Sequence, residues 1–207
     1  MELAGLPRLG KSVFADSLVD LLGAAGIRSK LIAKATTECP VADKWSTDFT
    51  SWTFAAVLKD YLEARAFGIA VAVADRGLFD SVLWMRMKCE SARCSPESVR
   101  VFRSLAMCGP WFENLCLVLA FTGDYDLVIR RASDRRLHNG DNTVSKPDVL
   151  PLLDKQMREE ASLWNRERRI VEVLQVDEAP VRDSMELAAE HVVAAIEAFA
   201  KARPRTS

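Results

Sequence analysis

One run of eight residues has the composition and spacing of a phosphate-binding loop: Gly5-Leu6-Pro7-Arg8-Leu9-Gly10-Lys11-Ser12. The two glycines permit backbone angles that a Cβ disfavours, so successive N–H groups can point inward at a phosphate. Lys11 is placed to reach the β- and γ-phosphates of a nucleotide, and the Ser12 hydroxyl to ligate Mg²⁺. We therefore expect this segment, together with Val13, to bind Mg-ATP.

The elements that must position this loop are indicated by the pattern of apolar residues. Short apolar runs alternate with helical patterns, which is typical of a parallel α/β sheet. We expect strands at Glu2–Ala4, Lys30–Lys34, Ile69–Ala74, Leu115–Thr122 and Val171–Val176. We expect helices at Lys11–Ala25, Phe49–Ala66, Asp80–Cys89, Pro96–Met107, Asp124–Arg136, Lys146–Glu167 and Arg182–Ala200.

The loop lies where its chemistry requires, between the first expected strand and the first amphipathic helix. The N-terminus of that helix adds a partial positive charge that favours a bound phosphate. We therefore predict the P-loop NTPase fold, a three-layer α/β/α sandwich with a mainly parallel five-stranded sheet. Ligands are expected in the crevice at the carboxyl ends of the strands.

Composition limits the class of protein. The chain has 207 residues and no internal repeat, which predicts a single domain over residues 1–207. Its formal net charge is −1, so we expect no nucleic-acid partner, because proteins that neutralise many backbone phosphates usually carry a basic excess. No apolar run is long enough to cross a bilayer, so no membrane partner is expected. Five cysteines without a C-x-x-C pair favour a reducing cytoplasm, and two histidines supply a zinc site poorly.

An arginine cluster follows the fourth expected strand, with Arg130, Arg131, Arg135 and Arg136 inside seven residues. Arg131 and Arg135 are four residues apart and so share one helical face. A like-charge pair at that spacing is mildly destabilising unless an anion neutralises it. A transferring phosphoryl group is such an anion, and arginine clamps on it are a recurring catalytic device.

Two other classes of phosphate-loop protein fit the sequence poorly. A GTPase needs a guanine-reading [NT]-K-x-D after a hydrophobic strand, but the nearest match, Ser145 to Asp148, follows a polar run. Helicases and transport ATPases usually end a strand with two acidic residues. Here the strand that ends at Ala74 is followed by one acid and one base, Asp75 and Arg76.

The segment Asp75-Arg76-Gly77-Leu78-Phe79-Asp80 resembles the Asp/Glu-Arg motif of deoxynucleoside kinases and thymidylate kinases. In those families the acid lies near Mg²⁺ and the arginine contacts substrate or phosphate, which implies these roles for Asp75 and Arg76. The cluster after the fourth strand resembles the arginine-bearing lid of such kinases. The resemblance implies a lid at about residues 130–146, with Arg131 and Arg135 as catalytic arginines.

A third segment, Glu38-Cys39-Pro40-Val41 with Lys44-Trp45, resembles the Glu-Pro-Val and Lys-Trp segment of deoxynucleoside kinases. There the glutamate is the base on the attacking hydroxyl, which implies that role for Glu38. The intervening cysteine and the spacing depart from the family pattern. Five aromatic residues are expected to flank the acceptor pocket: Trp45, Phe49, Trp52, Phe79 and Trp84.

Together these residues predict a Mg-ATP-dependent phosphotransferase acting on a small molecule, with a nucleoside or nucleotide favoured. A sugar, a cofactor precursor or an antibiotic stays open as acceptor, and either Glu38 or Asp75 is the base. The alternative from another class is an ATP-binding regulatory protein that hydrolyses slowly without an acceptor. The oligomeric state is open and includes a homodimer.

Overall fold

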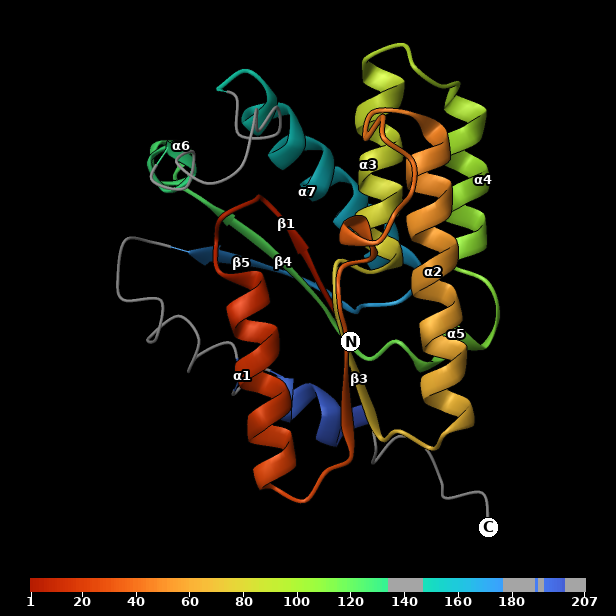
Figure 1. The fold of residues 1–207 in the computed structure, drawn as a ribbon, viewed down its shortest axis with the longest axis vertical. Helices are drawn as coiled ribbons and strands as arrows, with labels where there is room; N and C mark the ends of the chain where they lie inside the picture. Colours follow the sequence, from red (N-terminus) through yellow and green to blue (C-terminus); the bar gives the residue numbers. More distant parts are fainter. Residues whose placement is uncertain (134–146, 177–188, 190–191, 200–207) are drawn as a thin grey trace.

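The computed structural model describes residues 1–133, 147–176, 189 and 192–199. Its centre is a five-stranded sheet in the order β2-β3-β1-β4-β5, with every neighbouring pair parallel (Figure 1). The strands are β1 (Glu2–Gly5), β2 (Ser29–Ile32), β3 (Val71–Asp75), β4 (Val118–Gly123) and β5 (Val171–Val176). The strand that leads into the phosphate loop is therefore central. Chain order changes side at β1, which places the topological switch point of the sheet there.

The helices form layers on both faces of the sheet. They are α1 (Lys11–Ala24), α2 (Thr47–Ala66), α3 (Leu78–Glu90), α4 (Pro96–Ala106), α5 (Gly109–Asn114), α6 (Tyr125–Ser133) and α7 (Val149–Glu167), with a 3₁₀ turn η1 (Ala35–Thr37) after β2. Figure 1 shows α1 on one face, and α2, α3 and α7 on the other, with α4 packed outside α3. The predicted α/β/α sandwich with a parallel five-stranded sheet is confirmed.

The sequence analysis predicted all five strands, but several predicted boundaries differ from the observed ones for identifiable reasons. β3 begins at Val71 because Ile69 closes the end of α2 instead, its N–H donating to the Ala64 carbonyl at 2.9 Å after Gly68 in the left-handed region. β4 begins at Val118, because Leu115 is the C-cap of the short helix α5, which the sequence analysis missed, and the strand starts three residues later. The helix predicted at 182–200 falls mostly outside the described residues, and residues 192–199 of it are helical.

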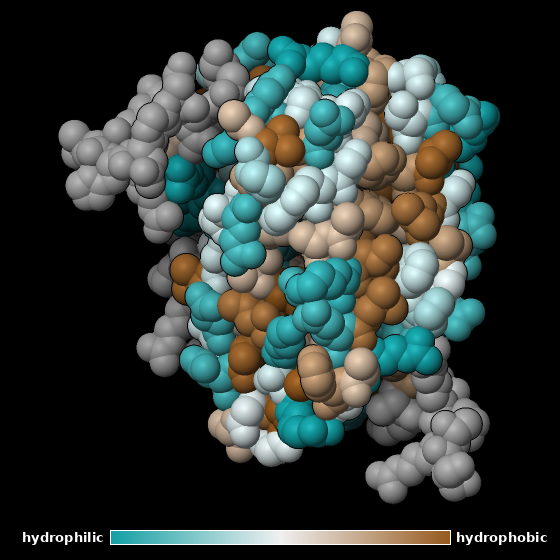
Figure 2. Space-filling view, turned by 45° about the vertical axis from the view of Figure 1, so that its right-hand side comes forward, coloured by the Kyte–Doolittle hydropathy of each residue, from teal (hydrophilic) through white to brown (hydrophobic). Residues whose placement is uncertain are grey.

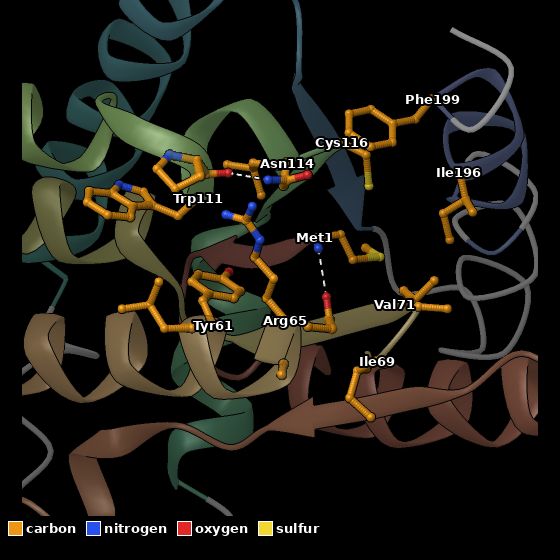
Figure 3. Close-up of a pocket in the computed structure, with 16 residues that line it drawn as sticks. Met1, Tyr61, Arg65, Ile69, Val71, Trp111, Asn114, Cys116, Ile196 and Phe199 are labelled. Carbon is orange, nitrogen blue, oxygen red and sulfur yellow. Dashed lines mark hydrogen bonds between the residues drawn. The ribbon is translucent and has the colours of Figure 1, made fainter. Parts of the chain in front are cut away.

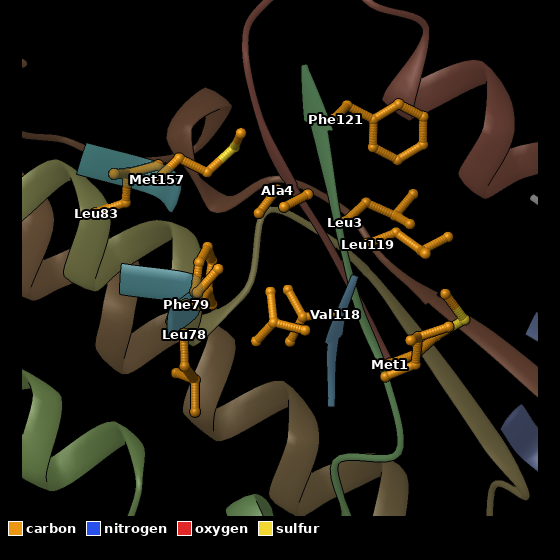
Figure 4. Close-up of a cluster of buried hydrophobic side chains, with 14 of the residues drawn as sticks. Met1, Leu3, Ala4, Leu78, Phe79, Leu83, Val118, Leu119, Phe121 and Met157 are labelled. Carbon is orange, nitrogen blue, oxygen red and sulfur yellow. The ribbon is translucent and has the colours of Figure 1, made fainter. Parts of the chain in front are cut away.

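The core fills the space between the sheet and the helices (Figure 4). Leu3 and Ala4 of β1 are fully buried, as are Val118 of β4 and Phe79 of α3. In the register of the sheet, Gly5 lies opposite Phe121 of β4. The loop thus starts directly from a paired residue of the central strand.

The surface of the described residues mixes polar and apolar side chains. Figure 2 brings the side of α2 and α4 forward and shows apolar atoms among polar ones. Leu62 on α2, and Val101 and Leu105 on α4, are among the exposed large apolar residues. Over the part of the chain that is described, no helix is both long and apolar enough to cross a membrane.

Candidate active site

The phosphate loop turns back on itself through three residues in the left-handed region. Gly5 has φ 101°, Arg8 φ 64° and Gly10 φ 85°. A Cβ on Gly5 would lie 2.2 Å from the carbonyl oxygen of Phe121, so no side chain fits there. Gly10 is the N-cap of α1, and the loop delivers Lys11 and Ser12 to the first turn of that helix. The backbone therefore has the shape that a phosphate cradle needs.

The side chains of the loop have different surroundings. Leu6 and Leu9 are buried in the core, so only their backbone can meet a phosphate, whereas Val13 is 53% exposed. The remaining members of the predicted set, Pro7 and Arg8, complete the turn between them. Two side chains of the predicted phosphate-binding set therefore hold the loop to the core.

Lys11 is folded back into the loop. Its Nζ donates to the carbonyl oxygens of Gly5, at 3.2 Å, and of Leu6. Burial, and to a smaller extent the nearby Arg76, lower the pKa of Lys11 to about 7, although Asp80 and Asp75 act in the opposite direction. The ammonium group is thus held by neutral carbonyls beside the cradle, in a position from which an anion can recruit it.

Ser12 and Asp75 meet although they are far apart in the chain. The Ser12 Oγ donates to Asp75 Oδ2 at 2.6 Å, which joins the start of α1 to the carboxyl end of β3. Both side chains line a hollow of about 190 Å³ at the carboxyl edge of the sheet. The other residues that line it are Ala15, Asp16, Leu31, Ala33, Lys34 and Thr37. The structure therefore brings together the two residues that the sequence proposed as metal ligands.

Arg76 is the third predicted residue at this edge. It has φ 72°, and its Nη1 lies 3.0 Å from Asp80 Oδ2, four residues later in the first turn of α3. Asp80 is 3% exposed, and its Oδ1 has no hydrogen-bond partner among the described residues. An acidic side chain in the first helical turn is favoured by the helix dipole. The guanidinium is therefore held in one direction by a carboxylate that keeps a free oxygen.

Glu38 lies apart from this group. It is exposed and ends the 3₁₀ turn η1 after β2, with its N–H donating to the Ala35 carbonyl at 3.1 Å. No hydrogen bond or ion pair of its side chain joins it to any described residue. Thr37, one position earlier, does line the hollow beside Asp75. The structure thus does not bring Glu38 into contact with the loop.

Only part of the arginine cluster lies among the described residues. Arg131, on α6, donates from Nη1 to the backbone oxygen of Arg8 at 3.3 Å, so it reaches the tip of the phosphate loop. Arg135 and Arg136, and residues 134–146 of the proposed lid, lie outside the described residues. One of the two predicted catalytic arginines is therefore placed at the site.

The five aromatic residues have different surroundings, and Trp52 is partly buried against the core. Phe79 is fully buried and packs edge-on against Trp164 with ring centroids 5.1 Å apart, so it belongs to the core and not to a pocket wall. Trp45 and Trp84 form a T-shaped pair at 6.2 Å and are half-buried. Phe49 lies under the ammonium group of Lys88, 5.8 Å from it.

Sequence reasoning missed three charged residues at this edge. Asp16 lies four residues after Ser12 and so on the same face of α1, a spacing that could have identified it. Asp80 stands in the same relation to Arg76. Lys34 gave no such signal, because only the fold brings the end of β2 beside the end of β3.

A second hollow, of about 230 Å³, lies at the opposite edge of the sheet (Figure 3). The Met1 ammonium group donates to the Ala72 carbonyl oxygen at 2.7 Å there, and Tyr61, Trp111 and Phe199 contribute to the walls. This hollow surrounds the amino ends of the strands. It is therefore separate from the phosphate loop.

Comparison with known proteins identifies the fold. No protein-family model and no curated protein matches the chain. Among solved structures, deoxyadenosine kinase from M. mycoides with bound dATP superposes with a TM-score of 0.67 at 15% identity, covering 93% of this chain and 98% of that one. The same enzyme with bound dCTP gives 0.62 at 15% identity over 94% and 100%. With the products dCMP and a flexible dCDP it gives 0.60, again at 15% identity over 94% and 100%. The chain has the fold of these P-loop kinases.

Proposed function

We propose that this chain is a Mg-ATP-dependent phosphotransferase whose acceptor is a small molecule, with a nucleoside or nucleoside monophosphate favoured. The observation that carries the proposal is the 2.6 Å hydrogen bond between Ser12 and Asp75. It places a hydroxyl and a carboxylate, which are ligand types that Mg²⁺ prefers, beside a glycine-turned loop with a buried lysine. The likeness in fold to deoxyadenosine kinase supports a nucleoside as acceptor.

The residues at this edge fit a nucleotide with its metal ion. Gly5 and Gly10 open the backbone toward a phosphate, and Ser12 and Asp75 would hold Mg²⁺. Among the described residues, no three His, Cys, Asp or Glu side chains gather into a metal site, so the remaining ligands would be phosphate oxygens and water. When bound, the ion would neutralise charge on the transferring phosphoryl group.

The side chains would then share the work of positioning and electrostatics. Lys11 would exchange the carbonyl oxygens of Gly5 and Leu6 for phosphate oxygens. Arg76, oriented by Asp80, and Arg131 would stabilise charge that develops on the phosphoryl group. Arg135 would add to this if the lid closes as the family resemblance implies. Either Asp75 or Glu38 would take the proton of the acceptor hydroxyl, and for Glu38 this requires the turn after β2 to approach the loop.

The chain supplies a matched control for testing the lysine. Lys88 is a second buried lysine, hydrogen-bonded to Thr50, and the pKa of Lys88 is lowered by burial to about 8. Lys11→Met should abolish acceptor-dependent ATP turnover and weaken ATP binding at least tenfold, whereas Lys88→Met should bind ATP as the wild type does. Binding is measured by calorimetry, and turnover by a coupled assay over nucleosides, nucleoside monophosphates and other hydroxyl metabolites.

The outcome separates the alternatives. Stimulation by one acceptor class, lost in Lys11→Met, would establish the phosphotransferase and name its substrate family. Slow hydrolysis that no acceptor stimulates would point to the ATP-binding regulatory protein. Equal ATP binding by wild type and folded Lys11→Met would overturn the assignment of the loop.

A further inference from the structure

A buried carboxylate lies directly beneath the turn that carries Asp75 and Arg76. Glu2, on the central strand β1, is fully buried. Its Oε1 accepts from the N–H of Leu78 at 2.9 Å, and its Oε2 accepts from the N–H of Phe79 at 2.9 Å. The carboxylate therefore caps the first two residues of α3, whose N–H groups have no partner inside the helix.

The same strand holds the other end of the turn. The N–H of Arg76 donates to the backbone carbonyl of Leu3 at 2.9 Å. A Cβ on Gly77 would lie 2.1 Å from the Glu2 carboxyl carbon, so the turn rests against this side chain with no room between them. Two consecutive residues of β1 thus hold the turn from both sides.

Tyr61 fixes the direction of the carboxylate. Its hydroxyl, on α2, donates to Glu2 Oε1 at 3.0 Å. Burial raises the pKa of Tyr61 well above its ordinary value, and the neighbouring Glu2 raises it further, so the hydroxyl stays a donor. With two backbone N–H groups and one hydroxyl, both oxygens of Glu2 are satisfied. A carboxylate whose two oxygens are both hydrogen-bonded is held in one orientation, and it holds the groups that donate to it in place.

We propose that Glu2 is a positioning residue of the active site, which sets Asp75 and Arg76 at a fixed distance from the phosphate loop. The loop begins at Gly5, three residues after Glu2 on the same paired strand. One short stretch of β1 therefore carries both the loop and the side chain that holds the turn. Tyr61 orients Glu2 from α2. This inference rests on the proposed function, because it assigns Asp75 and Arg76 to Mg²⁺ and phosphate.

The choice of residue supports a role beyond filling the core. A carboxylate in the centre of a sheet is costly to bury, and an apolar side chain would fill the same space at lower cost. The three hydrogen bonds offset that cost. They also fix the path of the backbone between β3 and α3, where it passes over β1. A side chain needed for packing alone would not require as partners the backbone N–H groups of Leu78 and Phe79, which directly follow the turn.

The test compares Glu2→Gln with Glu160→Gln. Glu160 is also fully buried and hydrogen-bonded, but it lies on α7, and its hydrogen-bond partners Arg103, Arg86 and Trp164 are not part of the turn. We expect Glu2→Gln to raise the Mg²⁺ concentration for half-maximal turnover several-fold and to lower kcat about tenfold, with the KM for ATP changed less than twofold. Glu160→Gln should lower the melting temperature comparably and leave the Mg²⁺ requirement unchanged. Tyr61→Phe should shift Mg²⁺ dependence in the same direction as Glu2→Gln, but less.

A second readout needs no activity. Amide hydrogen exchange at Leu78 and Phe79 should be at least tenfold faster in Glu2→Gln than in Glu160→Gln. Unchanged exchange at these amides, or a Mg²⁺ requirement equal to that of Glu160→Gln, would overturn the proposal for Glu2. A wild-type protein with no turnover on any acceptor would instead overturn the proposed function, while the exchange measurement still decides whether Glu2 holds the turn.

Discussion

Two buried clusters of charged residues in this molecule are built on opposite principles. On α7, Glu160 accepts hydrogen bonds from Arg103 at 2.6 and 2.7 Å, from Arg86 at 3.0 Å and from the Trp164 indole at 3.0 Å. Its carboxylate is saturated. It joins α7 to α3 and α4, the two helices that carry its arginine partners.

The cluster around the phosphate loop is left incomplete. Among the described residues, Asp80 keeps an oxygen without a hydrogen-bond partner, and Lys11 donates to two carbonyl oxygens and to no carboxylate. Burial lowers the pKa of Lys11 to about 7. A buried polar group without a partner costs free energy, and a ligand that supplies the missing partner would recover it. We therefore assign the saturated Glu160 carboxylate to stabilising the fold, and the incomplete cluster at the phosphate loop to binding.

The largest effect should come from breaking the saturated cluster. Glu160→Ala removes the acceptor of Arg103 and of the Trp164 indole N–H, and one of the carboxylates that pair with Arg86. It should therefore lower the free energy of unfolding by about 3–5 kcal/mol. Chemical denaturation measures this. ATP affinity of the molecules that remain folded should stay within twofold of the wild type. A variant that loses ATP binding but not stability would reverse the roles assigned to the two clusters.

A slightly smaller loss of stability is expected where the loop leaves β1. Gly5→Ala adds a Cβ at 2.2 Å from the Phe121 carbonyl oxygen, on backbone with φ 101°. Because the clash is with backbone of a paired strand, it should cost about 2–4 kcal/mol and distort the cradle. Here stability and ATP binding should fall together, as thermal unfolding and calorimetry can show. Gly23→Ala is the control, since a Cβ there meets no atom within 4 Å.

Residues of the fold and of the candidate site show how much the sequence alone can predict. The glycine and lysine spacing identified the loop because backbone N–H groups can surround a phosphate in few ways, and the run 69–74 identified a buried strand from composition. The pairing of Ser12 with Asp75 followed from the family pattern. Glu2 could not be recognised, because its partners on α2 and α3 come near only when the sheet forms. Phe79 was misplaced, because a buried aromatic and a pocket wall look alike in sequence.

A substitution at Asp80 tests whether the two clusters have separate roles. Asp80→Asn keeps the shape of the side chain and removes the charge that orients Arg76, while Oδ1 has no hydrogen bond to a described residue that the change could break. We expect a loss of stability under about 1 kcal/mol and a fall in kcat of roughly tenfold. Steady-state kinetics and thermal unfolding on one preparation measure both. A large loss of stability with unchanged kcat would place Asp80 with the structural cluster.

The smallest expected effect is a proton taken up when ATP binds. In the free protein the pKa of Lys11 is lowered by burial to about 7, so at pH 8 most molecules carry a neutral amine. Phosphate oxygens favour the ammonium form and so raise this pKa in the complex. Binding at pH 8 must therefore take up a large fraction of one proton, and apparent affinity must fall as the pH rises above about 7.

Calorimetry of Mg-ATP binding in two buffers of different ionisation enthalpy counts these protons directly. At pH 6 the amine is already charged, so uptake should be close to zero, and the difference between pH 6 and pH 8 isolates Lys11. Burial also lowers the pKa of Lys88, to about 8. The same measurement on Lys88→Met therefore excludes a contribution of Lys88 to the proton count. Equal proton counts at both pH values would mean that Lys11 is charged before ATP arrives. In that case the cluster around the phosphate loop would be electrostatically complete without its ligand, and the contrast with Glu160 would rest on Asp80 alone.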